Sequence, residues 1–192
     1  MKALLVYPRF PDTYWGFRHA LSFIGKKSAF PPLGLLTVSA MMPVTWERRL
    51  VDMNIRPLTL DDVKWAAAVF CSAMVIQKDP LLQVIDLCKA NGKPVVVGGP
   101  YTSIGVDDLT SADHIFIGEV ENIFPEFCID FERGEAKRIY QATERPTLSC
   151  TPVPDFQLAE QALYSNMLVQ FSRGCPFQCE FCDIIELYGR IP

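Results

Sequence analysis

The sequence predicts an α/β fold built on a doubly wound, mostly parallel sheet of five strands. Five short apolar runs alternate with segments whose apolar residues have helical spacing, which is typical of a parallel sheet covered by crossover helices. Hydrophobic residues make up 49% of the 192 residues, enough to bury the core that such a sheet needs. The alternation stops after Gly134, which predicts that a different kind of segment follows.

The first elements follow one another closely. Ala3–Tyr7 is the first predicted strand, and Pro32–Met42 is a helix with proline in its first turn. Arg49–Asp52 is predicted as the second strand and Asp61–Trp65 as a short helix. Ala67–Ser72 is a continuous apolar run, as expected for a parallel strand that is buried on both faces.

The second half of the sheet continues the pattern. Pro80–Ala90 is predicted as a helix, which Asn91-Gly92 ends. Pro94–Val97 and His114–Ile117 are the fourth and fifth strands, and Glu121–Arg133 is the final helix. With right-handed crossovers, these elements predict a Rossmann-like sheet with the flavodoxin-like strand order 2-1-3-4-5.

The chain divides into three predicted parts. Residues 1–140 form the α/β domain, 141–166 a linker, and 167–192 the start of a second unit. Gln141–Phe156 holds three prolines without clear periodicity, which indicates a linker. The apolar stretch Met167–Phe171 is predicted as the first strand of the next unit.

The composition limits the binding partners and the cellular compartment that this protein can have. The net charge of −4 gives no basic surface for nucleic acid. No apolar run reaches the roughly 18 residues that a membrane span needs. Seven cysteines, an odd number, include three that are clustered, which favours metal binding in a reducing cytoplasm over a disulfide framework.

The three clustered cysteines form the most specific motif in the sequence. Cys175, Cys179 and Cys182 have the spacing C-x3-C-x2-C. Three thiolates on a tight loop can hold three corners of an iron–sulfur cluster and leave the fourth iron open to a small chelating cosubstrate. The alternatives are incidental cysteines on a surface loop or a zinc knuckle, but zinc usually takes four ligands and no Cys or His follows Cys182.

The segment Phe171–Cys182 resembles the signature of radical S-adenosylmethionine (SAM) enzymes. The resemblance implies that the three cysteines bind a [4Fe–4S] cluster, that its open iron chelates SAM, and that Phe181 lies beside the adenine. A radical SAM barrel has at least six βα repeats of about 30 residues each, whereas ten residues follow Cys182. We therefore expect an N-terminal fragment with only the first strand of a truncated barrel, inactive by itself and without an intact cluster or SAM.

A ligand site is expected beyond the carboxyl ends of the strands, where open α/β sheets bind their ligands. The 23-residue connection Pro8–Phe30 is rich in aromatic residues, and loops of this length are usually functional or disordered. Glycines follow the fourth and fifth strands at Gly98-Gly99 and Gly118, where they let a large flat ligand approach the backbone.

Several of these segments resemble the cobalamin-binding domain that precedes the barrel in one radical SAM subfamily: Ala29–Leu36, Val51–Asn54, Gly98–Thr102 and Gly118–Glu121. The resemblance, together with the position of the loops at the strand ends, implies cobalamin contacts at Trp15, Met74, Gly98, Gly99, Tyr101, Thr102, Gly118 and Glu119. The subfamily commonly has histidine where this chain has Tyr101 and glycine where it has Val120. A D-x-H-x-x-G motif is missing, so the resemblance implies base-off cobalamin without a histidine ligand.

For the whole enzyme, the resemblance implies radical methylation or cyclisation of an unactivated carbon in a small-molecule substrate. Hopanoid methylases and the anaerobic Mg-protoporphyrin monomethyl ester cyclase have this layout, and flavodoxin or ferredoxin is the expected electron donor. One alternative is a domain that has lost cobalamin and serves as a docking or lid module, which Tyr101 and Val120 favour. Another is a flavodoxin-like electron carrier, but no phosphate-binding run rich in Ser, Thr and Gly follows the first strand.

Overall fold

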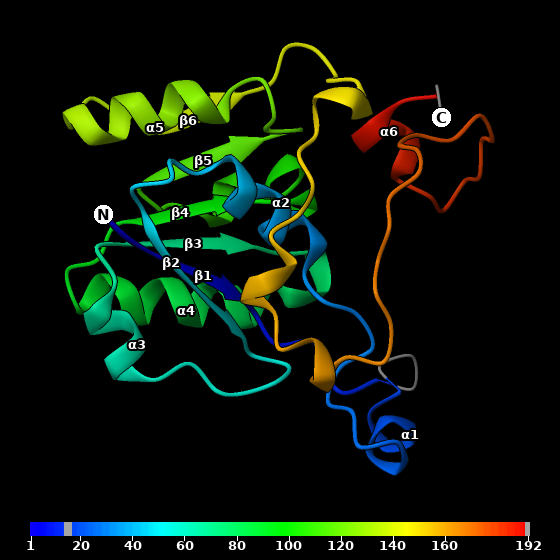
Figure 1. The fold of residues 1–192 in the computed structure, drawn as a ribbon. Coiled ribbons are helices and arrows are strands. Elements are labelled where there is room, and N and C mark those ends of the chain that lie inside the picture. Colours follow the sequence, from blue (N-terminus) through cyan, green and yellow to red (C-terminus); the bar gives the residue numbers. More distant parts are fainter. Residues whose placement is uncertain (14–16, 191–192) are drawn as a thin grey trace.

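The computed structural model describes residues 1–13 and 17–190, which form a parallel sheet between two layers of helices (Figure 1). The described strands are β1 (Lys2–Tyr7), β2 (Glu47–Asp52), β3 (Ala68–Ser72), β4 (Val95–Gly98), β5 (His114–Ile117) and β6 (Ile139–Gln141). The described α-helices are α1 (Arg18–Phe23), α2 (Leu33–Met41), α3 (Leu60–Trp65), α4 (Lys78–Ala90), α5 (Phe124–Arg133) and α6 (Ile184–Tyr188).

The strand order is β2-β1-β3-β4-β5-β6, and every pair of neighbours is parallel. The predicted α/β class and the order 2-1-3-4-5 are confirmed for the first five strands. The sixth strand corrects the predicted count of five. Only Tyr140 of the three residues of β6 is buried, and so short an edge strand has no periodicity that separates it from a linker.

The two faces of the sheet are covered by different helices because successive side chains of a strand point to opposite faces. Within β3, Val69 and Cys71 join the core beneath α3 and α4. Ala68 and Phe70 join the opposite core, where α2 and α5 supply Leu35, Phe124 and Phe127 among others. Figure 1 shows this division, with α3 and α4 on one side of the strands and α2 and α5 on the other.

The chain after β6 runs along the first domain with little regular structure. It contains the short 3-10 turns Leu148–Cys150, Phe156–Leu158 and Gln161–Leu163 before α6. Ser39 Oγ donates a hydrogen bond to Asp155 Oδ2 at 3.0 Å, and an isolated bridge pairs Ser28 with Tyr164. The predicted linker thus lies against the sheet domain, and the division at residues 140 and 166 stays a prediction.

The predicted strand Met167–Phe171 has no ladder partner among the described residues and is an irregular segment. Its side chains include the exposed Val169 and Phe171. A strand is stable only when its backbone groups pair with a neighbour, and the part of the chain that the structure describes supplies none here.

Within the same described part, no helix is long and apolar enough to cross a membrane.

Candidate functional site: a pocket at the carboxyl edge of the sheet

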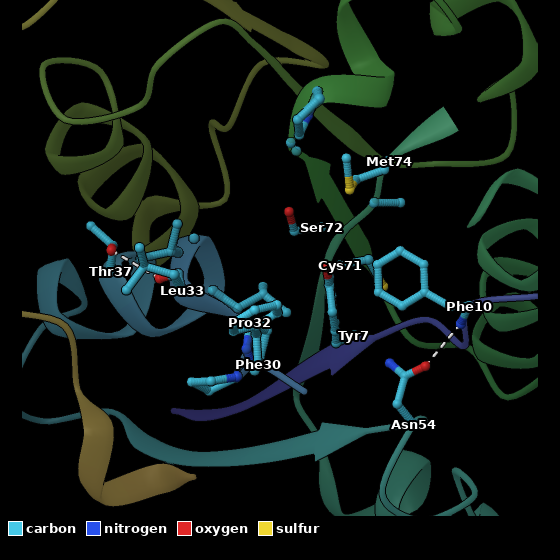
Figure 2. A pocket seen from close by; sticks show the side chains of 18 of the residues that line it. Tyr7, Phe10, Phe30, Pro32, Leu33, Thr37, Asn54, Cys71, Ser72 and Met74 are labelled. Atoms are coloured by element: carbon cyan, nitrogen blue, oxygen red, sulfur yellow. Dashed lines mark hydrogen bonds between the residues drawn. The ribbon is translucent and has the colours of Figure 1, made fainter. Parts of the chain in front are cut away.

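A pocket of about 1230 Å³ lies at the carboxyl ends of the central strands. Its lining includes Tyr7 at the end of β1, Ser72 at the end of β3, Gly98 at the end of β4 and Gly118 just after β5. Figure 2 shows the pocket from close by, with side chains from the sheet, from the loop after β1 and from α2 around it. This is the edge at which doubly wound sheets bind their ligands.

Gly99 brings two strand ends close together at the floor of the pocket. Its φ of +93° belongs to the region that favours glycine. A Cβ at this position would lie only 2.4 Å from Ser72 Oγ and 3.0 Å from the backbone nitrogen of Ala73. The absence of a side chain therefore lets the loops after β3 and β4 pack directly on each other.

Hydrogen bonds fix the start of the long aromatic loop against the sheet. The backbone N–H of Phe10 donates to Asn54 Oδ1 at 2.9 Å, as the dashed line in Figure 2 shows. The buried Gln77 side chain donates from Nε2 to the carbonyl of Pro8 at 2.6 Å. These two bonds hold the loop over the ends of β1 and β2, so Tyr7 and Phe10 form a defined wall of the pocket.

An ion-pair network closes the pocket on the side of β5. The guanidinium of Arg173 contacts the carboxylates of both Glu119 and Glu121, the latter at 2.6 Å. Thr151 Oγ1 donates to Glu121 Oε1 at 2.9 Å. Burial alone would raise the pKa of Glu121, but the hydrogen bonds from Arg173, the backbone and Thr151 outweigh it and hold this pKa below its ordinary value.

The tail completes the lining of the pocket. Leu168 and Gln170 precede Arg173, and Leu187 and Tyr188 belong to α6, yet all of them line the cavity. Figure 1 shows this orange-to-red segment beside the carboxyl ends of the strands. The cavity is therefore shared between the sheet domain and the tail that bears the cysteines.

The structure brings five of the predicted cobalamin contacts together in the pocket lining: Met74, Gly98, Gly99, Gly118 and Glu119. Trp15 lies outside the described residues. Tyr101 and Thr102 are not in the lining, since both side chains are buried below it. The Tyr101 hydroxyl donates to Asp108 at 2.5 Å, and the Thr102 hydroxyl bonds the carbonyl of Phe116 at 2.6 Å.

The cysteine motif is not assembled into a metal site among the described residues, which hold no group of three or more His, Cys, Asp or Glu side chains able to bind a metal ion. Cys179 is exposed, and Cys175 and Cys182 are partly exposed. Phe181 is 92% exposed and does not line the pocket. In this structure the three thiols are therefore not gathered around one point, and their role as cluster ligands stays a prediction.

A buried carboxylate links the pocket wall to the linker. Asp52 is only 4% exposed and accepts hydrogen bonds from Tyr164 at 2.9 Å and from the side chain of Asn54 at 2.7 Å. Burial raises the pKa of Asp52 although these bonds oppose the shift. Burial and the charge of Asp52 also raise the pKa of Tyr7 to about 12, which keeps this phenol of the pocket wall protonated.

The variant Asp52→Asn is expected to become more stable relative to the unchanged protein as the pH rises. A folded-state pKa above the unfolded value of about 3.9 favours the protonated carboxyl. Stability is therefore lost as the pH rises from the unfolded value through the raised folded one, whereas the amide of the variant does not titrate. Urea unfolding of both proteins between pH 3.5 and pH 7 measures this, and a difference that is independent of pH would contradict it.

The fold and the pocket define a class: an α/β domain with a large, mostly apolar pocket at the carboxyl edge of its parallel sheet. No protein-family model matches the chain. Over its full length, the chain is 46% identical to an uncharacterised methyltransferase of Synechocystis sp. and 37% identical to the hopanoid C-2 methylase of Rhodopseudomonas palustris. It is 26% identical, over 83% of its length, to the bacteriochlorophyllide d C-12(1)-methyltransferase of Chlorobaculum tepidum.

The chain is thus a homologue of these methylases, as its resemblance to cobalamin-dependent radical SAM enzymes predicted. It spans 36% of the Synechocystis and Chlorobaculum proteins and 37% of the hopanoid methylase. The activity and substrate of a whole protein of this kind are therefore proposals for this chain.

Proposed function

We propose that this chain binds cobalamin in the pocket at the carboxyl edge and is the cofactor-binding part of a methyltransferase. The observation that carries the proposal is the size of the cavity. Its volume of about 1230 Å³ exceeds the roughly 300–1,000 Å³ of pockets for drug-sized ligands. A corrin ring with its nucleotide tail is a ligand of that larger class.

The lining suits such a ligand. Phe10, Leu33 and Met74 offer apolar contacts for a flat macrocycle, and the backbone is accessible at Gly98 and Gly99. None of the described lining residues is a histidine, which agrees with a cobalt that has no histidine ligand. When bound, cobalamin would supply a carrier for a methyl group, and the protein's part is to orient this cofactor and exclude water from it.

The cysteine motif extends the proposal to the whole protein. We propose that Cys175, Cys179 and Cys182 ligate a [4Fe–4S] cluster that binds SAM, with Phe181 beside the adenine. A small-molecule substrate and an electron donor such as flavodoxin or ferredoxin would then be the partners of the whole enzyme. The motif and the homology to named methyltransferases support this.

The alternative is a docking or lid module that has lost cobalamin. Val120 favours it, because this side chain lines the pocket where the subfamily commonly has glycine. Tyr101 does not favour it, because the tyrosine is buried beneath the pocket and removes no contact surface. The cavity therefore stays open despite both departures.

Titration with hydroxocobalamin is expected to change its visible spectrum with one molecule bound per chain. The variant Met74→Glu places a charge on the apolar wall and should weaken binding at least 10-fold, since an unpaired charge is costly to bury. Val44→Glu is the matched control because Val44 is 92% exposed and lies outside the pocket lining. No spectral change with the unchanged protein, or equal weakening by both variants, would refute the proposal. Tight binding of FMN in place of hydroxocobalamin would favour the alternative that the protein is a flavodoxin-like electron carrier.

A further inference from the structure

The ion pairs of Arg173 with the two glutamates that follow β5 join parts of the chain that are far apart in sequence. Glu119 and Glu121 follow β5, Thr151 lies in the segment after β6, and Arg173 lies in the tail. The Arg173 guanidinium spans both carboxylates and also donates to Thr151 Oγ1 at 3.2 Å. We call these four residues the arginine clamp.

Burial separates the clamp from the surface ion pairs of the described residues. The side chains of Arg173, Glu119 and Glu121 are 13%, 7% and 4% exposed. In contrast, Lys137 and Glu126 are 62% and 54% exposed, and such pairs contribute little. Loss of the guanidinium would leave two nearly buried carboxylates without their cationic partner. Because an unpaired buried charge is costly, these carboxylates would regain water by releasing the tail.

The clamp lies at the base of the cysteine loop. Arg173 is two residues before Cys175, and the backbone N–H of Cys175 donates to the carbonyl of Gly189 at 3.0 Å. This bond closes a loop that contains all three cysteines of the motif. Because Arg173 is fixed to the end of β5, the base of that loop is fixed there too.

The clamp is also part of the pocket. Arg173, Glu119 and Glu121 are lining residues, together with Leu168 and Tyr188 of the tail. A ligand that fills the pocket therefore contacts the sheet domain and the tail at once. A planar guanidinium can bridge two carboxylates in this way, whereas the point charge of a lysine cannot match the geometry.

From this geometry we infer that Arg173 is a positioning residue that docks the cysteine-bearing tail at the mouth of the pocket and couples the two sites. Docking does not require a ligand. The coupling rests on the proposed function, because it needs a bound cofactor. Filling of the pocket stabilises the docked tail, and the docked tail in turn strengthens binding in the pocket.

Hydrogen exchange measured by mass spectrometry tests docking without any ligand. Arg173→Gln should raise the exchange rates of amides in residues 167–190 at least 10-fold and leave β1, β3 and β4 unchanged. Arg173→Lys should give an intermediate rate. Lys137→Gln, which removes an exposed cation, should leave the tail at the rate of the unchanged protein. Unchanged tail exchange in Arg173→Gln, or equal loosening of the sheet, would overturn the inference.

A second measurement tests the coupling. Hydroxocobalamin should slow exchange of the tail in the unchanged protein but not in Arg173→Gln, and the variant should bind it at least 5-fold more weakly. If the unchanged protein binds no hydroxocobalamin, the proposed function and the coupling both fail, whereas docking is judged by the first measurement alone. Equal slowing of the tail in both proteins would overturn the coupling.

Discussion

Changing Gly99 to alanine is expected to lower the free energy of unfolding by about 3 kcal/mol or more and to abolish ligand binding in the pocket. The backbone at Gly99 has φ +93° and ψ 178°, a region that is essentially restricted to glycine and costs other residues about 1–3 kcal/mol. The added Cβ would also lie 2.4 Å from Ser72 Oγ, and overpacking of this kind costs about 1–3 kcal/mol more. Urea unfolding measures the first effect and hydroxocobalamin titration the second.

Gly134→Ala is the matched control for Gly99. Gly134 also has a positive φ, +72°, but its Cβ would meet nothing within 4 Å. The variant should lose only about 1–2 kcal/mol, the cost of a left-handed conformation without a clash, and it should keep the pocket. An equal loss of stability in the two alanine variants would contradict this prediction. It would show that the close approach between the loops after β3 and β4 does not require glycine at position 99.

The change Phe127→Ala is expected to cost about 3–5 kcal/mol, because it leaves a cavity in the core beneath α5. Phe127 is fully buried, and its ring centroid lies 5.1 Å from that of Phe116 and 5.3 Å from that of Tyr140. These edge-to-face contacts add to the loss of buried area. Chemical denaturation followed by circular dichroism measures the effect.

Phe23→Ala provides the control, because Phe23 is 89% exposed and should change stability by less than about 0.5 kcal/mol. A loss below about 1 kcal/mol in Phe127→Ala would contradict the view that this aromatic cluster holds α5 on the sheet.

The sequence predicts the central sheet well because buried parallel strands are continuous apolar runs. Ala67–Ser72 is such a run, and it contains β3 (Ala68–Ser72). The edge strand β6 was missed because its three residues are too few to show a period. The helix α1 was missed because it lies within Pro8–Phe30, which was treated as one long connection. Met167–Phe171 has the composition of a strand, but composition cannot supply the neighbour with which a strand must pair.

The candidate site was predicted in part. Residues placed by the backbone, such as Gly98, Gly99 and Gly118, could be assigned to the carboxyl edge because topology alone puts them there. Tyr101 and Thr102 were assigned through the resemblance of Gly98–Thr102 to a cobalamin-binding segment, but the 3-10 turn Pro100–Ser103 buries both of their side chains. Arg173 was missed because its carboxylate partners are more than 50 residues away in the sequence. The arginine beside the cysteines and the two glutamates after β5 could each be seen in the sequence, but not their contact.

The shared lining of the pocket has a consequence for biosynthesis. The sheet is complete when β6 has left the ribosome, but the wall that Arg173 and Tyr188 form requires roughly 50 more residues. At about 5–20 residues per second, translation of that stretch takes about 2–10 seconds. During that interval the nascent chain presents a folded sheet whose carboxyl edge is still uncovered, so the proposed cofactor would meet an open site before the tail closes over it.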